Sequence, residues 1–83
     1  MFLARPIMLL MTKKEFLKKF GAHVSRIRRQ KGYSQDRLCL EAGLSRGTVS
    51  KIEAAKTEAK VYTIAKVAKT LRVPLSKLTD FEF

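Results

Sequence analysis

Residues 34–55 read SQDRLCLEAGLSRGTVSKIEAA, and the two halves of this stretch carry the signals of two short helices. Ser34 is a favoured N-cap residue, and Gly43 is of the residue type that most often ends a helix. Leu38 and Ala42 lie four residues apart, so both fall on one side of this helix and are predicted to face the core. The first half therefore predicts a helix that opens at Ser34 and closes at Gly43.

The second half predicts another helix, over residues 45–55, because Ser45 is again a favoured N-cap. Val49 and Ile52 are three residues apart and form its inward side. Between the two helices residues 42–45 read AGLS, in which the glycine turns the chain and the leucine enters the core. Two short helices joined by a glycine-containing turn of three or four residues form a helix-turn-helix.

A longer helix is predicted before this motif, over residues 13–31. Thr12 and Glu15 have the spacing of a capping box at its start, and Gly32 supplies a stop at its end. Its apolar positions recur at helical spacing and lie within one stripe, which comprises Phe16, Leu17, Phe20, Val24 and Ile27. The stripe predicts a helix with one side on the core and its lysines and arginines in solvent.

Two more helical segments follow the motif. Residues 61–72 place apolar side chains on one face, and Pro74 prevents this helix from continuing. Residues 75–78, LSKL, predict a last short turn of helix. The alternation of apolar and polar residues that is typical of strands does not occur in the sequence. The sequence therefore predicts an all-α fold of five helices in one domain, residues 13–83.

Composition and charge narrow the classes of partner. The chain of 83 residues carries 18 Lys and Arg against 7 Asp and Glu, a net charge of +11, which favours nucleic acid or an acidic membrane surface. One cysteine, Cys39, and one histidine, His23, provide neither an internal disulfide nor a metal-binding cluster. No metal or cofactor is expected, a cytoplasmic location fits the cysteine count, and no catalytic motif predicts an enzyme.

Residues 1–12 begin with MFLARPIMLLM, an apolar run interrupted by Arg5 and Pro6. The run is too short for a membrane span, which needs about 20 residues, and it lacks the basic start of a signal peptide. Two interpretations stay open. Either translation starts at Met8 or Met11, or the segment is an apolar arm, disordered or packed on the domain or on a partner subunit.

Residues 20–78 resemble the Cro/CI-like (Xre) helix-turn-helix family. The resemblance rests on Ser34-Gln35, Leu38, the AGLS turn, Val49-Ser50, Ile52-Glu53 and the later pattern of Thr63-Ile64, Val67-Ala68 and Leu71. It implies a lambda-repressor-like domain of five helices that binds double-stranded DNA through the third helix, usually as a homodimer on a palindromic operator. In that geometry the third helix enters the major groove, where its first half meets the base edges.

The resemblance and the predicted helix faces together define a DNA-contacting set. Its members are Gln35, Ser45, Arg46, Gly47, Thr48, Ser50, Lys51, Lys56 and Lys60. Arg46 is the foremost candidate for reading the DNA sequence, because a guanidinium can bond O6 and N7 of guanine together. Generic phosphate binding is the alternative role for Arg46 and for Lys51. Gln35, Lys56, Lys60 and Arg29 are candidate phosphate contacts, which set affinity rather than sequence choice.

Other residues are expected to support the scaffold rather than to contact DNA. Arg28 and Glu53 match a pair that in the family forms a partly buried ion pair between the first and third helices. The pair would fix the recognition helix on the scaffold, and removing one partner would cost more than breaking an exposed pair. His23 borders the apolar stripe of the first helix and Cys39 takes a small-residue core position, so both are expected to be structural.

The sequence departs from the family pattern at three places. Ala54-Ala55 stands where the family often has Gly or Asn, and Ala59 stands where a proline commonly opens the fourth helix. Residues 54–60, AAKTEAK, favour helix, so they predict a third helix longer than usual. Arg72 occupies the position at which a glycine commonly ends the fourth helix.

The function expected from the resemblance is that of a small stand-alone transcriptional regulator, like phage repressors or the controller proteins of restriction-modification systems. The alternative is an antitoxin that binds DNA and neutralises a protein toxin. A third class is a basic amphipathic module that binds a membrane or a protein. Four apolar residues, Leu75, Leu78, Phe81 and Phe83, are candidates for a dimer interface, for core closure or for a frayed tail.

Overall fold

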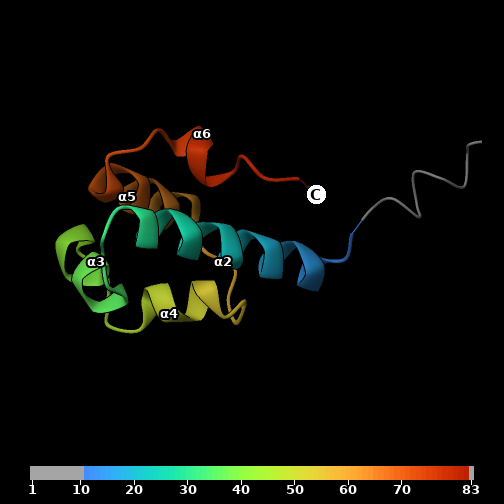
Figure 1. Cartoon of the computed structure of the whole chain (residues 1–83). Helices are drawn as coiled ribbons and strands as arrows, with labels where there is room; N and C mark the ends of the chain where they lie inside the picture. The colour runs from blue at the N-terminus through green and yellow to red at the C-terminus, as the bar shows by residue number, and fades with distance from the viewer. Residues whose placement is uncertain (1–10, 83) are drawn as a thin grey trace, which may run out of the picture.

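Five helices make up the computed structural model of the chain, which describes residues 11–82 (Figure 1). They are α2 (Lys13–Gln30), α3 (Gln35–Ala42), α4 (Thr48–Glu53), α5 (Val61–Leu71) and α6 (Leu75–Leu78). No strand occurs within residues 11–82, so the predicted all-α architecture of five helices is confirmed. The predicted N-terminal arm lies almost wholly outside the described residues, and so does Phe83.

The ends of α2 follow the local signals in the sequence. The hydroxyl of Thr12 accepts the backbone N–H of Glu15 at 3.1 Å, and the Glu15 carboxylate accepts the N–H of Thr12 at 2.8 Å. This reciprocal pair is the predicted capping box. At the other end Gly32 adopts a φ of +78°, a left-handed conformation that stops the helix after its C-cap, Lys31.

The first helix of the motif also begins and ends where predicted, but the second does not. Ser34 caps α3 by accepting the N–H of Arg37, and Gly43 closes it with a φ of +69°. The prediction that Ser45 caps the second helix is wrong. Residues 45–47 form a turn, in which the N–H of Thr48 donates to the carbonyl of Ser45, and α4 begins at Thr48 after a left-handed Gly47.

The prediction of a lengthened third helix is also wrong, because α4 ends at Glu53. Ala55 adopts a φ of +60°, and the N–H of Lys56 donates back to the carbonyl of Lys51 at 2.9 Å. The chain reverses here although residues 54–60 favour helix locally. Continuation of α4 would carry Ala59 away from the core on which it packs, so tertiary packing overrides local propensity.

The core lies between α2 and the other four helices. It comprises Phe20, Val24, Ile27, Leu38, Cys39, Ala42, Val49, Ile52, Ile64, Val67, Ala68, Leu71 and Leu78. The helix α2 packs against α4 on one side and α6 on the other, while α5 packs against α3 and α6 (Figure 1). This arrangement places α4 at the surface of the molecule, with one side of the helix buried against the core.

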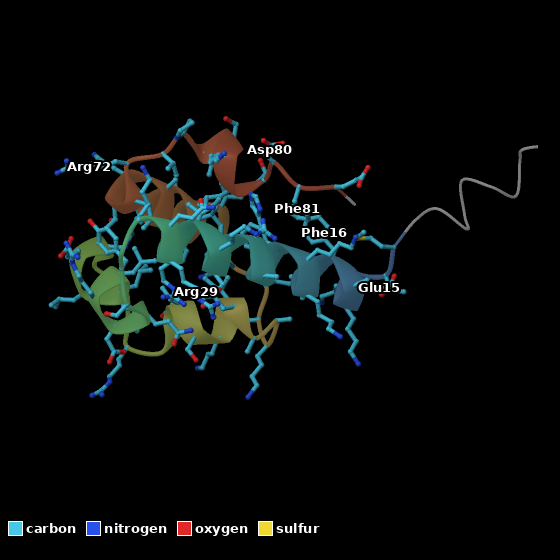
Figure 2. All side chains as sticks on the ribbon, in the orientation of Figure 1. Glu15, Phe16, Arg29, Arg72, Asp80 and Phe81 are labelled. Carbon is cyan, nitrogen blue, oxygen red and sulfur yellow. The ribbon has the colours of Figure 1, made fainter. Side chains whose placement is uncertain are left out.

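The C-terminal apolar residues divide between core and surface. Leu78 is fully buried, so it closes the core and does not present a surface to a partner. Phe81 is half-buried and lies beside Phe16 (Figure 2). The centres of the two rings are 5.5 Å apart. Of the four residues considered for a dimer interface, only Leu75 is largely exposed among those that the structure describes.

Candidate nucleic-acid interface

The helix α4 has one buried side and one exposed side. Val49 and Ile52 are buried in the core, whereas Ser50 and Lys51 point into solvent. Arg46 is exposed in the turn immediately before the helix. Of the other predicted contacts, Ser45, Lys56 and Lys60 are exposed, and Gln35, Gly47 and Thr48 are half-buried. The structure therefore gathers the outward residues of α4 and its preceding turn on one surface.

A buried ion pair fixes α4 to α2. The Nε of Arg28 donates to Oε2 of Glu53 at 2.6 Å, and a terminal guanidinium nitrogen donates to Oε1 at 2.9 Å. Only 9% of the Arg28 side chain and 7% of the Glu53 side chain are exposed. A bidentate pair of this kind sets both distance and orientation, so it determines how α4 sits on the scaffold.

Gln35 joins this pair from α3. Its side-chain amide nitrogen donates to Oε1 of Glu53 at 2.8 Å. The remaining terminal nitrogen of Arg28 donates to the carbonyl of Tyr33 at 2.8 Å, in the connection that leads into α3. The Glu53 carboxylate is thus the point at which α2, α3 and α4 are held together, and Gln35 braces α4 through it.

The network also stabilises the charged forms of its members. Burial acts to raise the pKa of Glu53, but hydrogen bonds from Arg28 and Gln35 and the attraction of Arg28 outweigh burial, so the pKa lies below its ordinary value. The hydrogen bond to Glu53 raises the pKa of Arg28 against the opposing effect of burial. Both groups are therefore ionised at neutral pH, and the pair is intact under physiological conditions.

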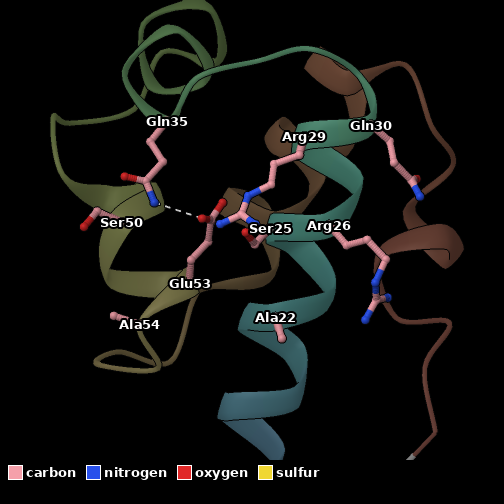
Figure 3. A pocket seen from close by; sticks show the side chains of 9 residues that line it. All are labelled: Ala22, Ser25, Arg26, Arg29, Gln30, Gln35, Ser50, Glu53 and Ala54. Atoms are coloured by element: carbon pink, nitrogen blue, oxygen red, sulfur yellow. Dashed lines mark hydrogen bonds between the residues drawn. The ribbon is translucent and has the colours of Figure 1, made fainter.

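An open polar cleft of about 710 Å³ lies between α2 and α4 (Figure 3). Its lining comprises Ala22, Ser25, Arg26, Arg29, Gln30, Gln35, Ser50, Glu53 and Ala54. Arg29 extends from α2 into the space between α2 and α4, and Ser50 lines the cleft from α4. The cleft thus brings together three of the predicted contacts, Gln35, Arg29 and Ser50. Arg46, Lys51, Lys56 and Lys60 do not line it.

Tyr33 is a supporting residue that sequence reasoning missed. Its hydroxyl donates to the carbonyl of Thr70 on α5 at 3.3 Å, and the Arg37 guanidinium lies 4.1 Å from the centre of its ring. A signal for it exists in the sequence. Tyr33 precedes the N-cap Ser34, and Leu38 occupies the fourth helical position, which is the spacing of a hydrophobic staple.

His23 and Cys39 are structural, as the sequence predicts. The Nε2 of His23 donates to the carbonyl of Lys77 at 2.7 Å, which links α2 to α6. The other ring nitrogen, Nδ1, lies 3.0 Å from a terminal guanidinium nitrogen of Arg26, which donates to it. Cys39 is a buried free cysteine in the core.

The comparison with protein families decides what kind of chain this is. A family model described as helix-turn-helix, HTH_3, matches residues 24–78. The chain belongs to the HTH_3 family. The matched range runs from the middle of α2 to the end of α6 and contains every residue that lines the cleft between α2 and α4 except Ala22. The family match confirms the resemblance to the Cro/CI-like (Xre) helix-turn-helix proteins.

Individual relatives agree with this membership. The chain is 40% identical over 63 residues to the HTH-type transcriptional regulator SlrR of Bacillus subtilis. The matched part spans 41% of the length of SlrR. It superposes on the restriction-modification controller protein C.AhdI of Aeromonas hydrophila with a TM-score of 0.78 and 29% identity. That match covers 82% of this HTH_3 chain and 99% of C.AhdI.

A second solved structure has the same fold. The hypothetical transcription factor NHTF from Neisseria matches with a TM-score of 0.72 and 28% identity, over 83% of this chain and 79% of that one. The five helices therefore form the Cro/CI-like fold of HTH_3 transcription factors.

Two kinds of feature are absent from residues 11–82 of this HTH_3 chain. No helix in that range combines the length and apolar composition that crossing a membrane requires. No group of three or more His, Cys, Asp and Glu side chains in the same range is arranged to hold a metal ion.

Proposed function

We propose that this chain is a transcriptional regulator that binds double-stranded DNA at a specific sequence by inserting α4 into the major groove. The observation that carries the proposal is the exposed side of α4, where Ser50 and Lys51 follow the exposed Arg46 while Val49 and Ile52 are buried. A helix anchored along one side can enter the groove with its other side facing the base edges. The net charge of +11 supplies the attraction to the phosphates.

In this proposal Arg46 is the main residue that recognises the DNA sequence. Its side chain is exposed in the turn at the start of α4, which is the end of a recognition helix that lies nearest the bases. A guanidinium there bonds O6 and N7 of one guanine, a contact that distinguishes the right base from a wrong one by about 1–3 kcal/mol. Lys51 reaches a second base or a phosphate, and the methyl group of Thr48 suits a thymine methyl.

In this proposal residues around α4 contact the DNA phosphates. Lys56 and Lys60 are exposed in the connection between α4 and α5, and Arg29 extends into the cleft between α2 and α4. The amide of Gln35 is held beside that cleft by its hydrogen bond to Glu53. Contacts of this kind position the protein and make binding depend on salt, but they carry no sequence information.

The binding unit in this proposal is a homodimer on a palindromic operator. One short helix reads few base pairs, and two copies about 34 Å apart read two half-sites on the same side of the duplex. The likeness to C.AhdI, a restriction-modification controller protein, supports a transcriptional regulator over an antitoxin. A toxin or restriction gene beside the coding sequence would distinguish the two possibilities.

Selection of bound duplexes from random DNA, at about 150 mM salt, tests the proposal. The expected result is a two-fold symmetric consensus, and Arg46→Ala should weaken or relax one base pair in each half-site. Lys77→Ala is the matched control, because Lys77 is an exposed cation on α6, which packs on the side of α2 opposite α4 (Figure 1). Binding without a consensus, lost steeply as salt rises, would contradict sequence-specific regulation.

A further inference from the structure

An apolar groove lies outside the surface that the proposed function assigns to DNA. It has a volume of about 340 Å³, and its apolar walls comprise Phe16, Leu17 and Phe20 of α2, Val61 and Ile64 of α5, and Leu75 of α6. No residue of α3 or α4 lines it. The groove therefore needs an explanation other than contact with DNA.

The groove combines exposed apolar side chains with buried ones. Val61 is 77% exposed and Leu75 is 42% exposed, whereas Phe20 and Ile64 are buried. A surface with both projecting and recessed apolar side chains can pair with a second copy of itself about a two-fold axis. Each copy then places its projecting side chains against the recessed part of the other, which is how the same patch serves both partners in a symmetric dimer.

The groove is electrically balanced although the protein is strongly basic. The charged residues that line it are Lys13 and Glu58, whose exposed side chains pair at 3.3 Å. Two copies, each with a net charge of +11, approach one another most easily through surfaces without net charge. An apolar centre with a polar rim is also the usual composition of a homodimer interface. An acidic partner protein would instead favour one of the basic surfaces.

The position of the groove suits two copies on one duplex. Its lining includes Glu58 and Ala59 of the connection between α4 and α5, so the groove extends from α6 toward the end of α4. It therefore lies on a flank of the molecule, between the side of α2 that carries α4 and the side that carries α6 (Figure 1). Two copies related by a two-fold axis along this flank present both α4 helices at the same end of the dimer, as binding to one side of a duplex requires.

We propose that this groove is the surface through which two copies of the chain form the homodimer. The inference rests on the proposed function, which supplies the homodimer, and it adds where the two copies meet. Salt then acts on assembly in the direction opposite to its action on DNA binding. It screens the repulsion between the two copies and leaves the apolar contact intact, whereas it weakens the attraction between the protein and the phosphates.

Sedimentation equilibrium of the full chain, at several concentrations and without DNA, tests the interface. The variants are Val61→Glu and its matched control, Leu40→Glu. Both replace a strongly exposed apolar side chain on a helix and change the net charge equally, but Leu40 lies on α3, outside the groove. Val61 is the first residue of α5, where a carboxylate favours the helix, and Leu40 is 80% exposed. Both variants should therefore remain folded by circular dichroism.

We expect the natural chain to dimerise, with a dissociation constant that falls as the salt concentration rises. Val61→Glu should raise that constant about a hundredfold or more, because it places two carboxylates in one apolar interface, and Leu40→Glu should leave it unchanged. A chain that stays monomeric at every concentration and salt, or a dimer that Val61→Glu leaves intact, would overturn the proposal. So would a dimer that salt dissociates, since charge pairs rather than apolar contact would then hold it together.

Binding to DNA duplexes separates failure of this proposal from failure of the proposed function. Val61→Glu should bind an isolated half-site as tightly as the natural chain does and should lose the preference for the complete palindrome. A preference that survives Val61→Glu would place the interface elsewhere and leave sequence-specific binding standing. Absence of any consensus, in a chain whose dimer Val61→Glu dissociates, would contradict the proposed function and support the interface.

Discussion

Gly21 on α2 lies directly against the backbone of Ile52 on α4. A Cβ added at Gly21 would stand 2.5 Å from the carbonyl oxygen of Ile52 and 2.8 Å from that of Glu53. Real Cβ atoms do not approach a backbone oxygen so closely, and neither carbonyl belongs to a flexible side chain that could move aside. The glycine therefore sets how near α4 can approach α2, and with it the position of the exposed side of α4.

Gly21→Ala should destabilise the protein although alanine is the better helix former. Helix propensity alone predicts a gain of about 1 kcal/mol, whereas forcing a methyl group into a packed backbone contact costs about 1–3 kcal/mol. We expect a net loss of about 1 kcal/mol in urea unfolding, together with weaker DNA binding because α4 shifts. Ala22→Gly, at the exposed neighbouring position, isolates the propensity effect. A raised urea midpoint for Gly21→Ala would refute the argument.

Glu53→Ala should cost far more stability than removal of an exposed glutamate. The substitution leaves the guanidinium of Arg28 buried without its carboxylate partner, a change that costs about 3–5 kcal/mol. Glu41→Ala is the control, since Glu41 pairs with Arg37 at the surface and should cost about 0.5 kcal/mol or less. Urea unfolding followed by circular dichroism measures both, and equal losses would show that burial of the Arg28–Glu53 pair is not what stabilises α4.

The same pair predicts how stability changes in acid. Because the pKa of Glu53 is lower in the folded chain than its ordinary value of 4.5, its contribution is complete above that pH. The contribution is lost as the pH falls below 4.5 and through the folded-state pKa. The free energy of unfolding should therefore fall less steeply with acid in Glu53→Gln than in the natural chain. If the free energies of unfolding of the two proteins fall in parallel from neutral to acid pH, the lowered pKa of Glu53 is contradicted.

Within residues 11–82, two residues other than glycine adopt a left-handed backbone, and replacing either with glycine should stabilise the protein. Arg72 has a φ of +61° at the end of α5, and Ala55 has a φ of +60° after α4. The left-handed conformation costs residues with a Cβ roughly 1 kcal/mol that glycine does not lose. We expect Arg72→Gly and Ala55→Gly each to raise the Tm by a few degrees.

The control for these substitutions is Lys31→Gly. Lys31 caps α2 with a φ of −86°, a conformation that any residue adopts, so glycine there only adds flexibility to the unfolded chain and should lower the Tm. A lowered Tm at all three positions would mean that the left-handed backbone carries no strain.

Arg29→Gln should reduce the salt dependence of DNA binding without changing the selected sequence. If Arg29 contacts one phosphate from the cleft between α2 and α4, the slope of log K against log salt should fall by about 1. Lys77→Gln, on α6, should leave the slope unaltered. A changed consensus with Arg29→Gln would place this residue at a base edge instead, and an unchanged slope would remove it from the interface.

The ends of α2 and α3 could be predicted because short-range hydrogen bonds decide them. Thr12 with Glu15, Ser34 and Gly43 act on backbone groups within four residues, so their effect is already present in the linear sequence. Helical spacing of apolar residues likewise predicted most core positions of α2 and α5, but Val61, which the spacing puts on the apolar face of α5, is 77% exposed. The Arg28–Glu53 ion pair could be predicted only from the family resemblance. The two residues are 25 positions apart, so no local pattern in the sequence indicates that they are in contact.

By itself, the sequence determined the number of helices, most of their ends and the side of each that is buried. Only the tertiary structure decided where α4 begins and ends, because a left-handed Gly47 precedes the helix and a left-handed Ala55 reverses the chain after it, toward α5, which packs on α3. It also decided that Leu78 is buried, that Phe81 packs half-buried against Phe16, and that Gly21 is a contact point. Local preferences differ by tenths of a kilocalorie per residue, and burial of a whole side chain outweighs them by about tenfold.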